Sequence, residues 1–174
     1  CLDFTSGTDA IVTLGMKATR PETGYGYIQA DLSLASPRNR EIFRVDQFHE
    51  KPKREVAEAY LKEKNFFWNA GIFIWSAATI VNAFRVYQPN IAKIFDRIRP
   101  MLGTPDEQRI IDEVYPQCEN ISVDYAIMEK AEEIFVCPSD FGWSDLGTWG
   151  SLLLQTPKDI YGNAVIGQNV QLYD

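Results

Sequence analysis

A carboxylate and an ammonium group stand on neighbouring residues in Glu50-Lys51-Pro52. The stretch before them, residues 42–48, alternates apolar and charged residues as a half-buried strand does, and Pro52 limits how far this strand continues. Because open α/β sheets bind ligands at the ends of their strands, a fixed acceptor beside a fixed cation would suit a substrate that carries hydroxyls and phosphate. The alternative is a strand that simply ends in charged residues, and the motif alone leaves both interpretations open.

Two further polar residues stand in apolar or rigid surroundings. Asn69 lies near the start of a strand that we predict over residues 66–75, and a buried amide there must be hydrogen-bonded either to protein or to a ligand. Asp145 lies among glycines and aromatic residues in 141–149, a setting that suits an aspartate directed at a metal ion. For Asp145 the alternative is an Asx turn, the usual role of an aspartate near glycine.

The segment 19–27 contains Gly24 and Gly26, which can bring the backbone close to a ligand or adopt positive φ. The alternative is an ordinary surface loop. Apolar runs and helical periodicity predict the elements that must position these residues, and residues 31–40 are predicted to be irregular. The predicted strands are 10–16, 42–48, 66–75 and 134–138, and the predicted helices are 53–64, 77–87, 91–98, 110–114 and 122–131.

The composition excludes several classes of partner. The chain has 174 residues, a net charge of −7, 45% hydrophobic and 24% charged residues, which is typical of one globular domain. It lacks the basic stripe that nucleic-acid binding requires, so we expect no nucleic-acid partner. A small anionic substrate would need only local cations, for which Lys17, Arg20 and Lys51 are candidates.

The cysteines and the longest uncharged stretch indicate the compartment. Three cysteines without a CxxC pair and a single histidine give no zinc-site spacing, and we expect reduced thiols in a cytoplasmic protein. Residues 66–84 carry no charge, but Asn69 and Gly71 interrupt them and their character changes midway from strand to helix. We therefore predict no membrane-spanning segment.

Taken together, five separated blocks resemble the mannose-1-phosphate guanylyltransferases. They occur in the family's order and span most of the chain, which is far more specific than any one of them. The blocks are residues 19–28, 48–52, 68–73, 122–130 and 142–149.

The resemblance implies the fold class and the domain organisation. The fold is expected to be α/β, an incomplete mixed-sheet Rossmann-like nucleotide-diphospho-sugar transferase fold. Residues 1–156 would form the C-terminal, sugar-phosphate-binding portion of the nucleotidyltransferase domain. Residues 157–174 would be a linker and the start of a left-handed β-helical tail, because 161–170 alternates small, apolar and polar residues as hexapeptide turns do.

The resemblance also implies the reaction, which transfers GMP from GTP to mannose 1-phosphate and gives GDP-mannose and pyrophosphate with Mg²⁺. Mannose 1-phosphate, GTP and GDP-mannose would then be the partners, and we expect a homodimer because a half-domain should expose a sheet edge. The groups expected to hold the sugar hydroxyls are the backbone of Gly24, Tyr25 and Gly26, the carboxylate of Glu50 and the amide of Asn69.

Two residues carry the catalytic roles that the resemblance implies. Lys51 would hold the sugar phosphate, and Asp145 would be a Mg²⁺ ligand. A sugar phosphate is already ionised near neutral pH, so its oxygen can attack the α-phosphorus without a strong protein base. Positioning and charge neutralisation are then the main tasks of the protein.

The chain departs from the family's pattern in two places. The family's glycine-rich nucleotide signature and a second metal-binding aspartate do not occur in it, so we expect the enzyme to be active in full-length form and this chain alone to be inactive. The alternatives are a non-catalytic sugar-phosphate-binding or regulatory module and a nucleotidyltransferase for another sugar 1-phosphate. His49 stands where the family commonly has valine, and we interpret it as an outward strand residue rather than a catalytic base.

Overall fold

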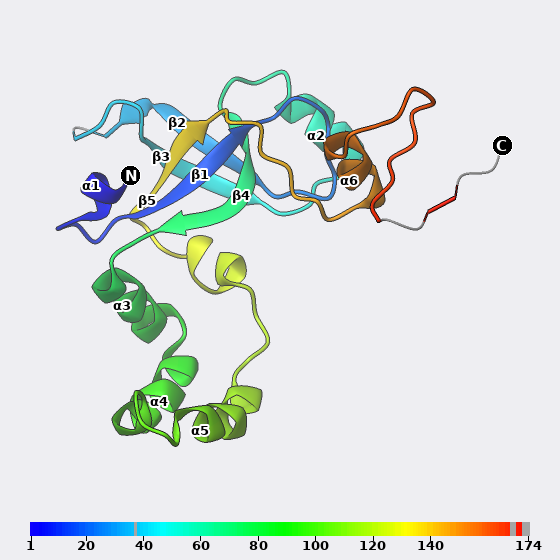
Figure 1. Ribbon diagram of the computed structural model, residues 1–174. Coiled ribbons are helices and arrows are strands. Elements are labelled where there is room, and N and C mark those ends of the chain that lie inside the picture. The colour runs from blue at the N-terminus through cyan, green and yellow to red at the C-terminus, as the bar shows by residue number, and fades with distance from the viewer. Residues whose placement is uncertain (37, 168–169, 172–174) are drawn as a thin grey trace. The chain divides into compact units, whose positions relative to one another are not determined.

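The computed structural model describes residues 1–36, 38–167 and 170–171 (Figure 1). The chain divides into two compact units, Cys1–Asp140 and Phe141–Asp174, which are described separately. This division falls at residues 140/141, whereas the boundary predicted from the sequence is at 156/157. The predicted extent of the sugar-phosphate-binding portion stays a prediction.

The first unit is built on one five-stranded mixed sheet. Its strands follow one another in the order β1-β4-β2-β3-β5, and among the described residues β1 and β5 form the one parallel pair. The mixed α/β class predicted from the sequence is therefore confirmed. The strands are β1 (Ile11–Lys17), β2 (Tyr27–Ala35), β3 (Phe43–His49), β4 (Phe66–Ile74) and β5 (Ile134–Ser139).

The sheet closes on itself, so the exposed sheet edge expected of a half-domain is wrong for the described residues. β3 reaches β5 through the pairs Phe43↔Val136 and Arg44↔Phe135. The β2–β3 ribbon bends far enough to do so because its register shifts twice, between Gln29/Ala30 and between Asp31/Ala35. Such irregularities increase the bend and twist of a ribbon. β2 continues to Ala35, which still pairs with Phe43, so residues 31–35 of the stretch predicted to be irregular form a strand instead. Residue 37 of that stretch lies outside the described residues.

Three strand ends and two strand starts meet at one end of the sheet. Tyr27 at the start of β2 pairs with both His49 at the end of β3 and Trp68 in β4. Trp68 also pairs with Met16 near the end of β1, and Met16 pairs with Ser139, the last residue of β5. The segments that follow β1 and β3 therefore leave the sheet at the end where β4 begins.

The helices of the first unit follow the predicted pattern where apolar periodicity is strong. Ser76 caps α3 as predicted, since its Oγ accepts the backbone N–H of Thr79 at 3.0 Å. Together α3, α4 and α5 extend from one side of the sheet, in green in Figure 1, and α4 and α5 share a small apolar core. The helices are α1 (Leu2–Thr5), α2 (Arg54–Tyr60), α3 (Ala77–Tyr87), α4 (Pro89–Ile98), η1 (Arg99–Met101), α5 (Glu107–Val114) and η2 (Tyr115–Gln117).

The helix predicted over residues 122–131 is shorter and wider than expected. The structure has a π-helical turn there, η3 (Asp124–Met128), in which Glu129 N–H donates to the carbonyl of Asp124 at 2.9 Å. Ala126, Ile127 and Met128 are fully buried in the main core, where they pack with Ile11 of β1 and Ile134 of β5. This packing fixes the turn against the sheet. π-helical turns of this kind often occur at functional sites.

The second unit contains α6 (Trp149–Gln155), whose start is fixed by a capping box between Thr148 and Ser151. The described residues of 157–174 form no strand, and Asp159 instead closes a turn by accepting the backbone N–H groups of Tyr161 and Asn163. A β-helical coil needs neighbouring coils to bury its apolar face, which this short stretch does not supply. The predicted tail also includes residues 168–169 and 172–174, which lie outside the described residues.

No helix within the described ranges is long and apolar enough to cross a bilayer. The uncharged stretch 66–84 forms β4 and most of α3, as its change of character predicts.

Candidate functional site

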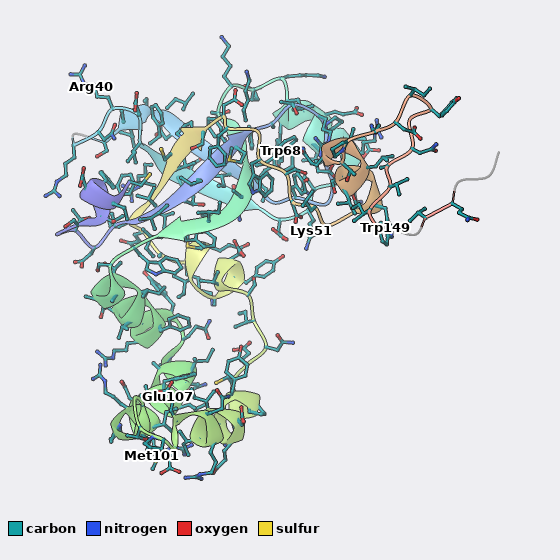
Figure 2. The ribbon with its side chains drawn as sticks, in the orientation of Figure 1. Arg40, Lys51, Trp68, Met101, Glu107 and Trp149 are labelled. Atoms are coloured by element: carbon teal, nitrogen blue, oxygen red, sulfur yellow. The ribbon has the colours of Figure 1, made fainter. Side chains whose placement is uncertain are left out.

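The exit of β3 places a charged pair at the shared end of the sheet. Glu50 and Lys51 follow the last strand residue, and the Lys51 Nζ lies 3.1 Å from the Glu50 Oε1. In the described part of the chain Lys51 is the single non-glycine residue with positive φ, 44°. The left-handed backbone turns the chain sharply between β3 and Pro52. The Lys51 side chain remains 65% exposed, so a ligand can reach its ammonium (Figure 2).

The Glu50 carboxylate lies directly against the backbone of Gly26. A Cβ at position 26 would be 2.7 Å from the Glu50 Oε2 and 3.4 Å from the Asn69 Cβ. Only glycine leaves room for this approach. Three predicted site residues from separate segments are therefore brought together by one close contact.

Asn69 lies in a bulge of β4. The β1–β4 register passes from Thr13↔Phe73 to Gly15↔Asn69, so β4 has more residues than β1 between these two pairs. Gly71, with φ of +66°, lets the bulge form, and its N–H donates to the Asn69 Oδ1 at 3.0 Å. The backbone N–H of Asn69 donates to the backbone carbonyl of Gly26 at 2.8 Å. Bulges commonly re-aim side chains beside active sites, and this one directs Asn69 toward the group around Gly26.

The structure adds Asp124 to this group, a residue of the predicted helix 122–131 to which the sequence analysis gave no role in the site. The Asn69 Nδ2 donates to the Asp124 Oδ1 at 2.9 Å, across 55 positions of the chain. The Asn69 amide keeps one N–H and one oxygen lone pair beyond its two protein bonds. No local pattern signals such a long-range contact, so only the fold could reveal Asp124.

The loop between β1 and β2 is held by its own side chains. The Glu22 carboxylate pairs with Arg20 at 3.2 Å and accepts the Gly24 N–H at 3.2 Å, so this predicted ligand-binding N–H has a protein partner. The Arg20 guanidinium lies over the Trp68 ring, 5.0 Å from its centroid, and Trp68 meets Tyr25 edge to face at 5.3 Å. Trp68 is only 4% exposed, so this stack anchors the loop beside the site.

The charges of the site favour the cationic form of Lys51. The hydrogen bond from Lys51 to Glu50 raises the pKa of the ammonium above its ordinary value, and the charges of Glu50, Tyr125 and Asp124 act in the same direction. The opposite holds for His49, because its partial burial lowers the pKa of the imidazole despite the nearby charge of Asp46.

His49 packs within an aromatic cluster, contrary to the expectation of a simple outward strand residue. Its ring lies 5.1 Å from that of Tyr60 and 5.7 Å from that of Phe66, and its Nε2 is 3.5 Å from the Gln29 Oε1. These neighbours explain the partial burial. We therefore assign His49 to packing rather than to proton transfer.

Asp145 belongs to the second compact unit and is exposed. Its Oδ2 lies 3.1 Å from the place that a Cβ on Gly147 would occupy, so Gly147 leaves room for the carboxylate. Within the described ranges no group of three or more His, Cys, Asp or Glu residues could hold a metal ion. A single carboxylate nevertheless fits Mg²⁺, which usually takes one or two protein carboxylates and completes its octahedron with phosphate oxygens and water.

The chain matches the family described as Nucleotidyl transferase over residues 2–160. It is 35% identical over 161 residues to a mannose-1-phosphate guanylyltransferase of Escherichia coli, covering 92% of this chain and 35% of the relative. It is 40% identical over 168 residues to mannose-1-phosphate guanylyltransferase 2 of Escherichia coli O157:H7, covering 94% of this chain and 35% of the relative. The chain thus spans about a third of the length of these curated relatives.

A solved structure shares the fold. The crystal structure described as mannose-1-phosphate geranyltransferase from Thermus thermophilus is 35% identical, with a TM-score of 0.72 over 88% of this chain and 42% of that chain. The family resemblance of the five sequence blocks therefore agrees with the similarity of the two folds.

Proposed function

Since the chain belongs to the nucleotidyl transferase family, we propose that its full-length protein is a mannose-1-phosphate guanylyltransferase and that this chain supplies the sugar-phosphate side. One observation carries the proposal. The carboxylate of Glu50 and the amide of Asn69 meet at the bare backbone of Gly26, and the ammonium of Lys51 pairs with that carboxylate. Acceptors, an amide and a cation together match the hydroxyls and phosphate of a sugar 1-phosphate. The names of the relatives support mannose as the sugar and GTP as the nucleotide source.

The reaction requires little covalent chemistry from these residues. An oxygen of the ionised mannose 1-phosphate attacks the α-phosphorus of GTP, and the bond to the β-phosphate breaks, which releases pyrophosphate and leaves GDP-mannose. Glu50 and Asn69 orient the sugar through its hydroxyls. Lys51 neutralises the sugar phosphate and reduces its repulsion with GTP. Positioning of this kind supplies much of the rate enhancement in phosphoryl transfer.

Asp145 is the residue of this chain that we assign to Mg²⁺. When bound, the ion would neutralise phosphate charge and orient the triphosphate. We further propose that nucleotide-binding residues outside this chain complete the active site, and that the full-length protein is cytoplasmic and has a β-helical tail. A homodimer would have to form through a surface other than a sheet edge, because the sheet closes on itself.

Calorimetric titration of mannose 1-phosphate into the chain, with glucose 1-phosphate as the control, tests the proposal directly. We expect selective binding of the mannose compound. Preference for glucose 1-phosphate would assign another sugar to the site. For the full-length protein we expect GDP-mannose to form from GTP and mannose 1-phosphate, and binding without product would identify a non-catalytic sugar-phosphate module.

Glu50→Gln should weaken the affinity for mannose 1-phosphate by about 10-fold, because the amide keeps the shape but offers a sugar hydroxyl an uncharged acceptor. The KM for mannose 1-phosphate and the KM for GTP of the full-length protein measure this effect, and only the former should rise. Glu58→Gln is a matched control, since Glu58 is an exposed carboxylate on α2 that pairs with Arg54. An unchanged KM for mannose 1-phosphate in the Glu50 variant would remove this carboxylate from the sugar site.

Gly26→Ala should reduce the affinity for mannose 1-phosphate by more than about 10-fold, because the new Cβ would fall 2.7 Å from the Glu50 Oε2 and displace the carboxylate. Calorimetry on the chain measures the change. Gly150→Ala is the control. Gly150 lies within α6, and its new Cβ would be 3.8 Å from the Thr148 Oγ1, which is an ordinary van der Waals contact. Wild-type affinity in the Gly26 variant would show that ligand binding does not depend on the close contact.

A further inference from the structure

The hydrogen bond between Asp124 and Asn69 fixes the orientation of an amide whose two ends otherwise look alike. A carboxylate only accepts and a backbone N–H only donates, so Asp124 must face the Asn69 Nδ2 and Gly71 must face the Oδ1. The second side-chain N–H and the second oxygen lone pair of Asn69 then each point in one fixed direction. Without Asp124, Gly71 alone would hold the amide.

Asp124 is itself rigidly held. It begins the π-helical turn η3, whose Ala126, Ile127 and Met128 are fully buried in the main core. The carbonyl of Ala126 also accepts the buried Gln88 Nε2 at 3.3 Å. The turn thus anchors Asp124 from the core side, whereas Asp124 itself is only partly buried.

The same carboxylate acts on the charged pair at the β3 exit. Its charge favours the ammonium form of Lys51, after the larger effect of Glu50. Because a lysine is already an ammonium at neutral pH, this contribution leaves the charge of Lys51 unchanged there, and the effect of Asp124 on binding passes through Asn69.

We infer that Asp124 is a positioning residue for the sugar 1-phosphate, which acts by fixing the Asn69 amide and which the sequence motifs did not assign. This inference rests on the proposed function for its ligand. The role requires no contact between Asp124 and the reacting atoms.

A double-mutant cycle in the full-length protein tests the inference. Asp124→Ala should raise the KM for mannose 1-phosphate by about 10-fold and leave the KM for GTP unchanged, because only the sugar side loses an oriented group. Asn69→Ala should raise it similarly, and the double variant should be no worse than Asn69→Ala alone. Asp124→Asn keeps an acceptor oxygen and should fall between wild type and Asp124→Ala. The inference would be overturned if the KM for mannose 1-phosphate of the double variant rose by the product of the two single-variant factors, or if this KM were unchanged in Asp124→Ala.

A second readout needs no activity. The side-chain amide resonances of Asn69 in the unliganded chain should shift in Asp124→Ala, whereas Glu129→Gln, which removes a charge at the end of the same turn, should leave them unchanged. Unshifted Asn69 resonances in Asp124→Ala would overturn the inference even if the ligand proved not to be mannose 1-phosphate. Absence of GDP-mannose formation by the wild-type protein, with the shift present, would overturn the proposed function alone.

Discussion

Asp145→Asn is expected to lower the turnover of the full-length protein by about 10²–10³-fold, the equivalent of several kcal/mol of lost charge stabilisation. The asparagine keeps the shape of the side chain but loses the charged oxygen that Mg²⁺ prefers. Because Asp145 is exposed, its replacement should not unfold the chain. The measurement is kcat at saturating GTP and mannose 1-phosphate over a Mg²⁺ titration, with circular dichroism to verify the fold.

The matched control is Asp140→Asn, which removes another exposed carboxylate that lies outside the predicted site. It should keep wild-type turnover at every Mg²⁺ concentration. The Asp145 variant should also need more Mg²⁺ to reach its reduced maximum. Full activity at saturating Mg²⁺ in the Asp145 variant would remove this residue from the metal site.

Local sequence patterns were sufficient for the elements with strong periodicity or clear caps. Ser76 and the apolar spacing that follows it predicted α3 with its observed bounds. The apolar run at 10–16 and the alternation at 42–48 likewise predicted β1 and β3. The next helix was predicted over residues 53–64, but α2 begins at Arg54 with Lys53 as its N-cap and ends at Tyr60.

The contacts that assemble the site depend on features that local patterns do not encode. The bulge at Asn69 arises from a register shift between two strands, and the wide turn at Asp124 arises from how its apolar residues pack. Neither the two-residue period of a strand nor the 3.6-residue period of a helix indicates a register shift or a widened turn. The closure of the sheet has the same origin, since it depends on register shifts between β2 and β3.

The conformation of Lys51 is the clearest case in which local rules mislead. A residue before proline is ordinarily extended, and a lysine rarely has positive φ. Lys51 nevertheless has φ of 44°, and its ammonium lies against the preceding Glu50. Unfavourable backbone conformations persist where the surrounding structure imposes them, often at functional sites. The charged pair was identified from the sequence, but its geometry was not.

Lys51→Met is expected to reduce kcat/KM for mannose 1-phosphate by about 10²–10³-fold, as does the loss of one well-placed charge-stabilising donor in other enzymes. Methionine removes the ammonium but carries the same cost of positive φ, so the variant isolates the charge from the backbone conformation. Because the pKa of Lys51 is raised, the wild-type ammonium persists as the pH rises through the ordinary value for lysine. Wild-type affinity should therefore hold from pH 7 to about pH 9, where the sugar phosphate is also fully ionised.

The expected loss has a specific control and a specific rescue. Lys53→Met removes a positive charge from an exposed side chain at the N-cap of α2 and should leave kcat/KM unchanged. Lys51→Arg keeps the charge on a longer planar group and should restore part of the activity, since phosphate accepts from either cation but their geometries differ. If methionine and arginine at position 51 were equally impaired, the geometry of the ammonium would outweigh its charge. Wild-type kcat/KM in Lys51→Met would mean that the sugar phosphate is held by another cation, for which Arg20, stacked on Trp68 in the adjoining loop, is the first candidate to replace.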